Sequence, residues 1–120
     1  MSRRLELIPL LNFPLVEPGD DLVQVIHTAL QENSLELQAG DVLVVAQKIV
    51  SKAQNRYVRL ADVTPSAEAI ALAERAGKDP RQVQLILQES REVLRVRPGV
   101  IIVEHRNGYV HANAGIDKSN

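Results

Sequence analysis

The apolar residues of the chain recur at helical spacing, three or four residues apart, in three segments. The first runs from Leu22 to Leu30 and follows aspartates that can cap a helix. The second covers residues 67–76 and ends at Gly77. The third begins with Asp79 as the capping residue and extends over residues 80–89, with proline at its first position. The pattern therefore predicts three helices.

Short apolar runs predict the strands of a sheet. Val42–Ala46 is continuous, rich in β-branched residues and too short for a typical helix, so we expect a buried strand at the centre of the sheet. Arg4–Pro9 alternates polar and apolar residues and is expected to form the first strand. Further strands are expected at residues 57–60, 93–96, 100–104 and 109–111, the last two joined as a hairpin through Asn107-Gly108. The expected fold is α+β, with a mixed β-sheet and packed helices.

Composition narrows the class of protein. With 120 residues, 45% of them apolar, the chain can bury one core, which indicates one domain or part of one. A formal charge of −1 gives no field to attract nucleic acid or an anionic membrane, and one phenylalanine and two tyrosines cannot build base-stacking platforms. Cysteine is absent, and no stretch has the pattern of a signal peptide or a membrane span. We therefore expect a cytoplasmic protein with no nucleic-acid or membrane partner.

The closing segment, residues 113–120, gathers oxygen-bearing side chains after a predicted strand. Hard cations such as Mg²⁺ and Mn²⁺ prefer oxygen ligands, and Asp117 is the carboxylate in this segment. One carboxylate cannot complete a metal site, so Asp117 could hold a metal only together with substrate phosphates or with carboxylates elsewhere. The alternative is an ordinary polar turn in which Asp and Asn bond their own backbone.

A second candidate follows the run Val42–Ala46. Lys48 and Lys52 are four residues apart and would share a face if this segment were helical, with Ser51 close by. A lysine ammonium supplies a point charge to a phosphate, although a solvated surface pair is the alternative. The glycines of a P-loop are missing. The three histidines are not spaced as a zinc site.

Taken together, four segments resemble in order and spacing the coenzyme F-420-0:L-glutamate ligase family, also called F-420 γ-glutamyl ligases. They are residues 18–22 (Pro-Gly-Asp-Asp-Leu), 40–45 (Gly-Asp-Val-Leu-Val-Val), 49–53 (Ile-Val-Ser-Lys-Ala) and 113–120 (Asn-Ala-Gly-Ile-Asp-Lys-Ser-Asn). The resemblance implies a GTP-dependent ligase that adds L-glutamate to the deazaflavin coenzyme F-420 precursor through an acyl phosphate. It also implies that residues 1–120 are the N-terminal, truncated portion of a longer ligase domain.

Carried over by position, the resemblance implies a site made from several segments. Asp117 would bind a divalent metal, Mn²⁺ or Mg²⁺, with K⁺ as a further candidate ion. GTP, the co-substrate, would contact Lys52, Asn120 and the loop formed by Leu11, Asn12, Phe13 and Pro14. The family also implies a homodimer. Gln54-Asn55 replaces a Glu-Gly pair of many relatives, so the loop after Lys52 is expected to differ in shape.

Two other functions stay open at this point. The chain could be a non-catalytic nucleotide- or coenzyme-binding module, or an inactive fragment that needs a second polypeptide. It could also be a structural domain whose polar closing segment is only surface. Nucleotide affinity without glutamate addition would favour the first, and failure of the intact-length protein to bind GTP with Mn²⁺ would favour the second.

Overall fold

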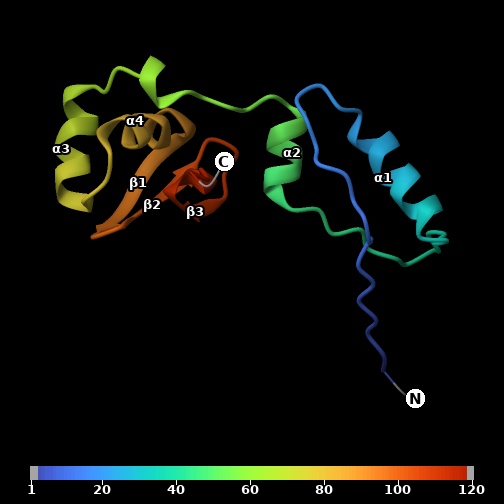
Figure 1. Ribbon diagram of the computed structural model, residues 1–120. Helices are drawn as coiled ribbons and strands as arrows, with labels where there is room; N and C mark the ends of the chain where they lie inside the picture. The colour runs from blue at the N-terminus through green and yellow to red at the C-terminus, as the bar shows by residue number, and fades with distance from the viewer. Residues whose placement is uncertain (1–2, 119–120) are drawn as a thin grey trace. The chain divides into compact units, whose positions relative to one another are not determined.

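The structure, a computed structural model, describes residues 3–118. The chain divides into two compact units, residues 1–57 and residues 58–120. Within the described residues there are four α-helices and a three-stranded antiparallel sheet (Figure 1). The expected α+β class is confirmed. None of the helices in residues 3–118 is long and apolar enough to cross a membrane.

The first unit contains helices α1 (Leu22–Glu32) and α2 (Gln47–Ala53). The Asp21 carboxylate caps α1 by accepting a hydrogen bond of 3.2 Å from the Gln24 N–H, which confirms the predicted helix start. The segment before α1 is tied to the end of α2, because the Gly19 N–H donates to the Ala53 carbonyl at 3.0 Å. The two helices are therefore linked through main-chain contacts inside one unit.

Three strands predicted for the first 60 residues are wrong. Arg4–Pro9 and Val42–Ala46 are both without regular structure. Val42 and Val44 are 83% and 86% exposed, so the run expected at the centre of a sheet is not buried. The segment predicted as a strand at residues 57–60 leads instead into a 3₁₀ turn, η1 (Leu60–Asp62). The physical reason is that a strand requires a partner, and neither apolar segment pairs with a strand within residues 3–118.

The second unit begins its regular structure with α3 (Ala67–Ala76) and α4 (Pro80–Glu89), whose bounds agree with the prediction. The Ser66 hydroxyl accepts a 3.1 Å hydrogen bond from the Ala69 N–H at the start of α3. Gly77 ends α3 at φ 63°, a left-handed conformation that glycine adopts without steric penalty. Local capping chemistry therefore determines where α3 begins and ends.

The sheet follows α4 directly. Its strands are β1 (Ser90–Arg97), β2 (Val100–His105) and β3 (Val110–Ala112), in that spatial order. β2 and β3 pair with Ile102 opposite Ala112, so the predicted Asn-Gly hairpin is confirmed. The turn between β1 and β2 is held to the end of α3, because the Gly99 N–H donates to the Ala76 carbonyl at 2.7 Å.

The core of the second unit lies where α3 and α4 pack on the sheet (Figure 1). Along β2 every second residue is buried, as expected for a strand with one face on a core. The buried apolar residues are Ala69, Leu72, Ala73, Ala76, Val83, Ile86, Ile101, Val103 and Ala114. Ala114 belongs to the segment after β3, so this core also anchors the closing segment of the chain. In contrast, Val16 and Ala29 are the only buried hydrophobic residues in the described part of the first unit.

Candidate functional site

The closing segment leaves β3 through a tight left-handed turn, η2 (Asn113–Gly115). Asn113, Ala114 and Gly115 have φ values of 54°, 54° and 70°. Left-handed backbone costs a residue with a Cβ about 1–2 kcal/mol, and asparagine tolerates it better than alanine. Ala114 is nevertheless only 4% exposed, so its burial in the core helps to hold the turn. Three consecutive left-handed residues indicate a segment whose path is imposed by its contacts.

The Asn113 side chain supplies one of those contacts. Its Oδ1 accepts a 3.0 Å hydrogen bond from the N–H of Ile101, a residue of the central strand. The Asn113 carbonyl accepts a second one, also 3.0 Å, from the Ile116 N–H. Asp117 comes next in the chain and is exposed. The predicted metal ligand therefore follows a turn that is fixed to the sheet, rather than a free terminus.

A charged cluster lies at the start of α4, in the same unit. Both carboxylate oxygens of Asp79 accept hydrogen bonds from the Arg81 guanidinium, at 2.7 and 3.1 Å. These hydrogen bonds, together with one from the Arg81 main-chain N–H, lower the pKa of Asp79 from 3.8 to about 2. The charge of Lys118 contributes in the same direction, so Lys118 lies within electrostatic reach of the start of α4. Asp79 therefore stays ionised at neutral pH and is already paired.

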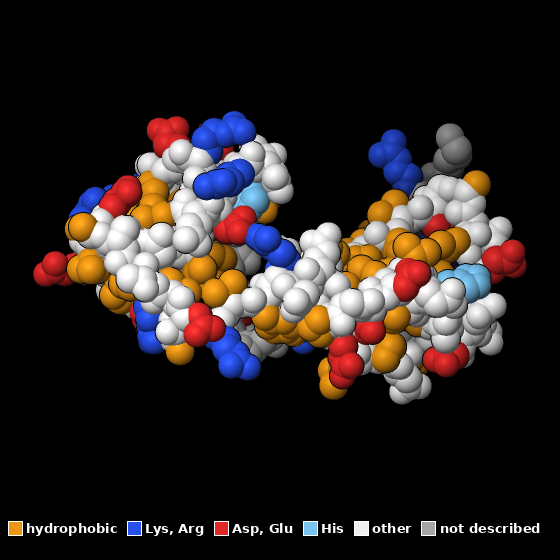
Figure 2. Space-filling model, turned by 90° about the horizontal axis from the view of Figure 1, so that it is seen from above, with side chains coloured by type: hydrophobic (Ala, Val, Ile, Leu, Met, Phe, Trp, Pro, Cys, Tyr) orange, Lys and Arg blue, Asp and Glu red, His pale blue; other side chains and the backbone are white. Residues whose placement is uncertain are grey.

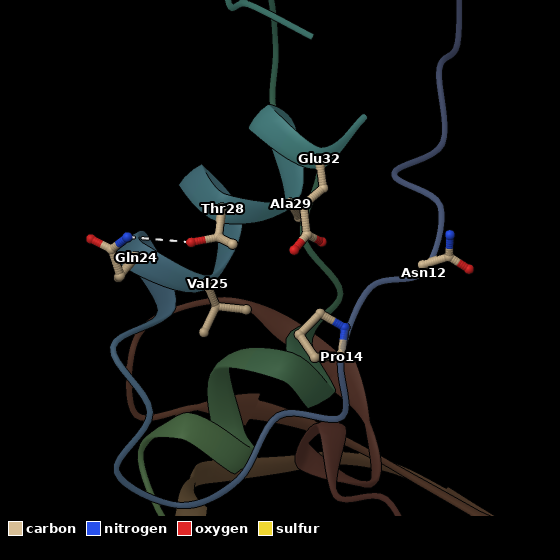
Figure 3. Close-up of a pocket in the computed structure, with 7 residues that line it drawn as sticks. All are labelled: Asn12, Pro14, Gln24, Val25, Thr28, Ala29 and Glu32. Carbon is tan, nitrogen blue, oxygen red and sulfur yellow. Dashed lines mark hydrogen bonds between the residues drawn. The ribbon is translucent and has the colours of Figure 1, made fainter. Parts of the chain in front are cut away.

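In the first unit the predicted nucleotide loop, Leu11–Pro14, lies beside α1. Asn12 and Pro14 line one side of a groove of about 260 Å³, and residues of α1 line the other (Figure 3). Asn12 has φ 56°, and Leu11 is 61% exposed. The α1 residues of the groove are Gln24, Val25, Thr28, Ala29 and Glu32. The structure therefore gives the loop an open, mixed polar and apolar surface.

Sequence reasoning missed the polar side of this groove. Gln24, Thr28 and Glu32 recur at intervals of four residues and form one stripe of α1. Figure 3 shows the three on the same helix, with the Gln24 amide donating to the Thr28 hydroxyl at 3.3 Å. This spacing was visible in the sequence. Asn33, which hydrogen-bonds to Leu11, was also missed, and no sequence pattern singles it out.

The lysines of the first unit lie on α2, so the condition under which they share a face is met. Lys48, Ser51 and Lys52 are all partly buried. Lys52 lies in the last turn, where a cation interacts favourably with the helix dipole. Lys52 and the Leu11–Pro14 loop thus belong to one unit and Asp117 to the other. Asn120, the remaining predicted nucleotide ligand, lies outside the described residues.

Within residues 3–118 no three His, Asp or Glu side chains gather closely enough to hold a metal ion. The oxygen chemistry of Asp117 suits Mn²⁺ or Mg²⁺, but further ligands would have to come from phosphates or from residues outside this range. His105 has a structural role instead. Its ring stacks on Tyr109 with centroids 4.4 Å apart, its Nδ1 accepts from the Asn107 N–H, and its Nε2 lies 3.3 Å from a Glu89 carboxylate oxygen.

Comparison with known proteins adds a family to this geometry. A sequence model described as F420-0:Gamma-glutamyl ligase matches residues 10–120. The chain is 47% identical over 116 residues to the coenzyme F420:L-glutamate ligase of Methanothermobacter thermautotrophicus, a match that covers 97% of this chain and 46% of that protein. It is 48% identical over 117 residues to the enzyme of the same name from Methanopyrus kandleri, covering 98% of this chain and 44% of the relative.

A more distant relative agrees. The coenzyme F420:L-glutamate ligase of Methanocaldococcus jannaschii is 36% identical over 119 residues, which are 99% of this chain and 46% of the relative. The chain thus spans a little under half the length of the curated relatives it matches. The matched residues, 10–120, include the Leu11–Pro14 loop, α2 and the closing segment. The chain belongs to the F420-0:Gamma-glutamyl ligase family.

Proposed function

We propose that this chain is part of a GTP-dependent ligase that joins L-glutamate to a precursor of coenzyme F-420. Membership of the ligase family, with 36–48% identity over nearly the whole chain, is the observation that carries the proposal. In the reaction a carboxylate of the precursor attacks the γ-phosphate of GTP and displaces GDP, giving an acyl phosphate. The amino group of glutamate then attacks the acyl carbon, inorganic phosphate leaves, and the nitrogen loses a proton as the amide forms.

The chain's residues take distinct parts in this proposal. The Leu11–Pro14 loop, beside the groove of α1, binds the nucleotide, and Lys52 neutralises phosphate charge. Asp117 holds the divalent cation, Mn²⁺ or Mg²⁺, which would screen the phosphate oxygens during transfer. Asn120 is assigned to GTP as well. Since catalysis of phosphoryl transfer is mainly positioning and electrostatics, the fixed turn before Asp117 suits this role. K⁺ as an additional ion and a homodimer complete the proposal.

A second candidate is favoured by two observations. The chain spans less than half of its relatives, and the described residues supply no complete metal-ligand set. The chain alone would then bind GTP or the coenzyme without transferring glutamate, and would need a second polypeptide to complete the ligase. This candidate differs from the first in its chemistry and not in its nucleotide loop.

Mass spectrometry separates the two. The 120-residue chain is incubated with the unglutamylated coenzyme precursor, GTP, Mn²⁺ and L-glutamate, and the molecular mass of the product is measured. A product heavier by one glutamyl unit supports ligation by this chain. Nucleotide binding without a new product, together with product formation by a longer protein that contains the same sequence, supports the non-catalytic module. Absence of both binding and product, in the chain and in the longer protein, refutes both.

A further inference from the structure

One side chain connects the nucleotide loop to α1. Asn33, the residue that ends α1, makes three side-chain hydrogen bonds. Its Oδ1 accepts from the Leu11 N–H at 2.9 Å, and its Nδ2 donates to the Leu11 carbonyl at 3.1 Å. The same Nδ2 also donates to the Ala29 carbonyl at 2.8 Å. The amide thus joins the last turn of the helix to a residue 22 positions earlier in the chain.

These hydrogen bonds determine the path of the loop, because burial of its side chains contributes little. Asn33 satisfies both main-chain polar groups of Leu11, as a neighbouring strand would do. Burial contributes little at this position, since the Leu11 side chain is 61% exposed. Asn12, the next residue, is held at φ 56°, which a mobile chain adopts only rarely. The hydrogen bonds to Asn33 therefore precede and support the left-handed turn of the loop.

We propose that Asn33 is a positioning residue for nucleotide binding: by clamping both main-chain groups of Leu11, it sets the geometry of the Leu11–Pro14 loop against the groove of α1. Asn33 acts through the loop and does not itself contact the nucleotide. This inference rests on the proposed function for the identity of the ligand. It adds a residue that neither the family motifs of the sequence nor the groove itself includes.

The chemistry of the clamp requires an amide. Aspartate at this position keeps an acceptor for the Leu11 N–H but has no donor for the Leu11 and Ala29 carbonyls. Its negative charge would also face two carbonyl oxygens. Alanine removes all three side-chain hydrogen bonds. The loop should therefore be released partly in Asn33→Asp and fully in Asn33→Ala.

A matched control separates loop positioning from helix stability. The Asp21 side chain caps the other end of α1, where its carboxylate accepts a hydrogen bond from the Gln24 N–H. Asp21→Ala therefore weakens the same helix and leaves the clamp on Leu11 intact. Any effect common to Asp21→Ala and Asn33→Ala comes from the helix. An effect confined to Asn33→Ala comes from the loop.

Two measurements on the 120-residue chain test the proposal. Amide hydrogen exchange by NMR follows the Leu11 N–H, and a fluorescent GTP analogue with Mn²⁺ gives the nucleotide Kd. In Asn33→Ala, Leu11 exchange should become about 5- to 30-fold faster, and the Kd should rise about fivefold or more. In Asp21→Ala the amides of α1 should exchange faster while the Kd changes less than about twofold.

Each alternative result of these two measurements would overturn a specific part of the proposal. Equal Kd increases in Asp21→Ala and Asn33→Ala would make Asn33 a helix cap only. Unchanged Leu11 exchange in Asn33→Ala would remove the clamp. If the wild-type chain and the longer protein both fail to bind the analogue, the proposed function fails and Asn33 has no nucleotide to position. Faster Leu11 exchange in Asn33→Ala would then still show that the clamp holds the loop.

Discussion

The left-handed turn that precedes Asp117 depends on the amide of Asn113, and Asn113→Ala tests how strongly. The change removes the acceptor of the Ile101 N–H in a strand whose side chain at this position is fully buried. An unsatisfied buried N–H costs about 1–3 kcal/mol, and placing alanine instead of asparagine at φ 54° adds about 1 kcal/mol. We therefore expect Asn113→Ala to lower the unfolding free energy of the second unit by about 2–4 kcal/mol.

Hydrogen exchange of the slowest amides in α4 and β2 measures this change in the second unit alone, which avoids assuming that the two units unfold together. A loss of about 2–4 kcal/mol corresponds to exchange that is roughly 30- to 1,000-fold faster. Asn113→Asp is the matched control. It keeps an oxygen acceptor and tolerates the left-handed backbone, so its loss should be no more than about 1 kcal/mol. Equal losses in the two variants, or a loss below about 0.5 kcal/mol in Asn113→Ala, would refute the reasoning.

Three further predictions concern the same unit. Ile86→Ala, at a fully buried position of α4, should destabilise the second unit by about 2–5 kcal/mol in the same exchange measurement. Ile70→Ala, at a position 51% exposed on α3, should change the stability of that unit by less than about 1 kcal/mol. Comparable losses in the two variants would contradict the described core. Because the pKa of Asp79 in the folded chain is lowered to about 2, the contribution of this carboxylate to stability is complete above pH 3.8 and is lost as the pH falls toward 2. In Arg81→Ala, a carboxyl ¹³C titration should show the pKa of Asp79 moving back up. An unchanged pKa would contradict the hydrogen bonds from Arg81 as the cause. Asp117→Asn should abolish Mn²⁺-dependent GTP binding measured by calorimetry, while the unfolding free energy stays within about 0.5 kcal/mol of the wild-type value. Unchanged binding would remove Asp117 from the proposed metal site.

The helices and the hairpin of the second unit were predictable because their signals are local. Ser66 and Asp79 cap the helices that directly follow them, and Gly77 supplies the left-handed residue at which α3 ends. The Asn107-Gly108 pair specifies a tight turn between neighbouring strands. Each signal needs only a few adjacent residues to take effect, so the sequence contains all the information required.

The expected strands of the first unit were not predictable in the same way. Val42–Ala46 has the composition of a buried strand, but pairing and burial depend on residues distant in sequence. No periodicity reveals whether such a partner exists. The candidate site shows the same division. The Leu11–Pro14 loop came from a family resemblance, and Asp117 from its oxygen chemistry together with that resemblance, whereas the hydrogen bonds of Asn33 appear only in the folded chain, between residues 22 positions apart.

Exposed apolar side chains occur at the surface of the chain (Figure 2), and those of Val42–Val45 form one uninterrupted stretch, from 37% to 86% exposed. A β-prone stretch of this kind, with its main chain unpaired in the described structure, can act as a template for the same stretch of another molecule. Exposure of this stretch affects the tendency of the chain to self-associate more than its folding. We expect the solubility of the 120-residue chain to be limited by its own concentration, so that dilute samples stay monodisperse while concentrated ones associate through this stretch.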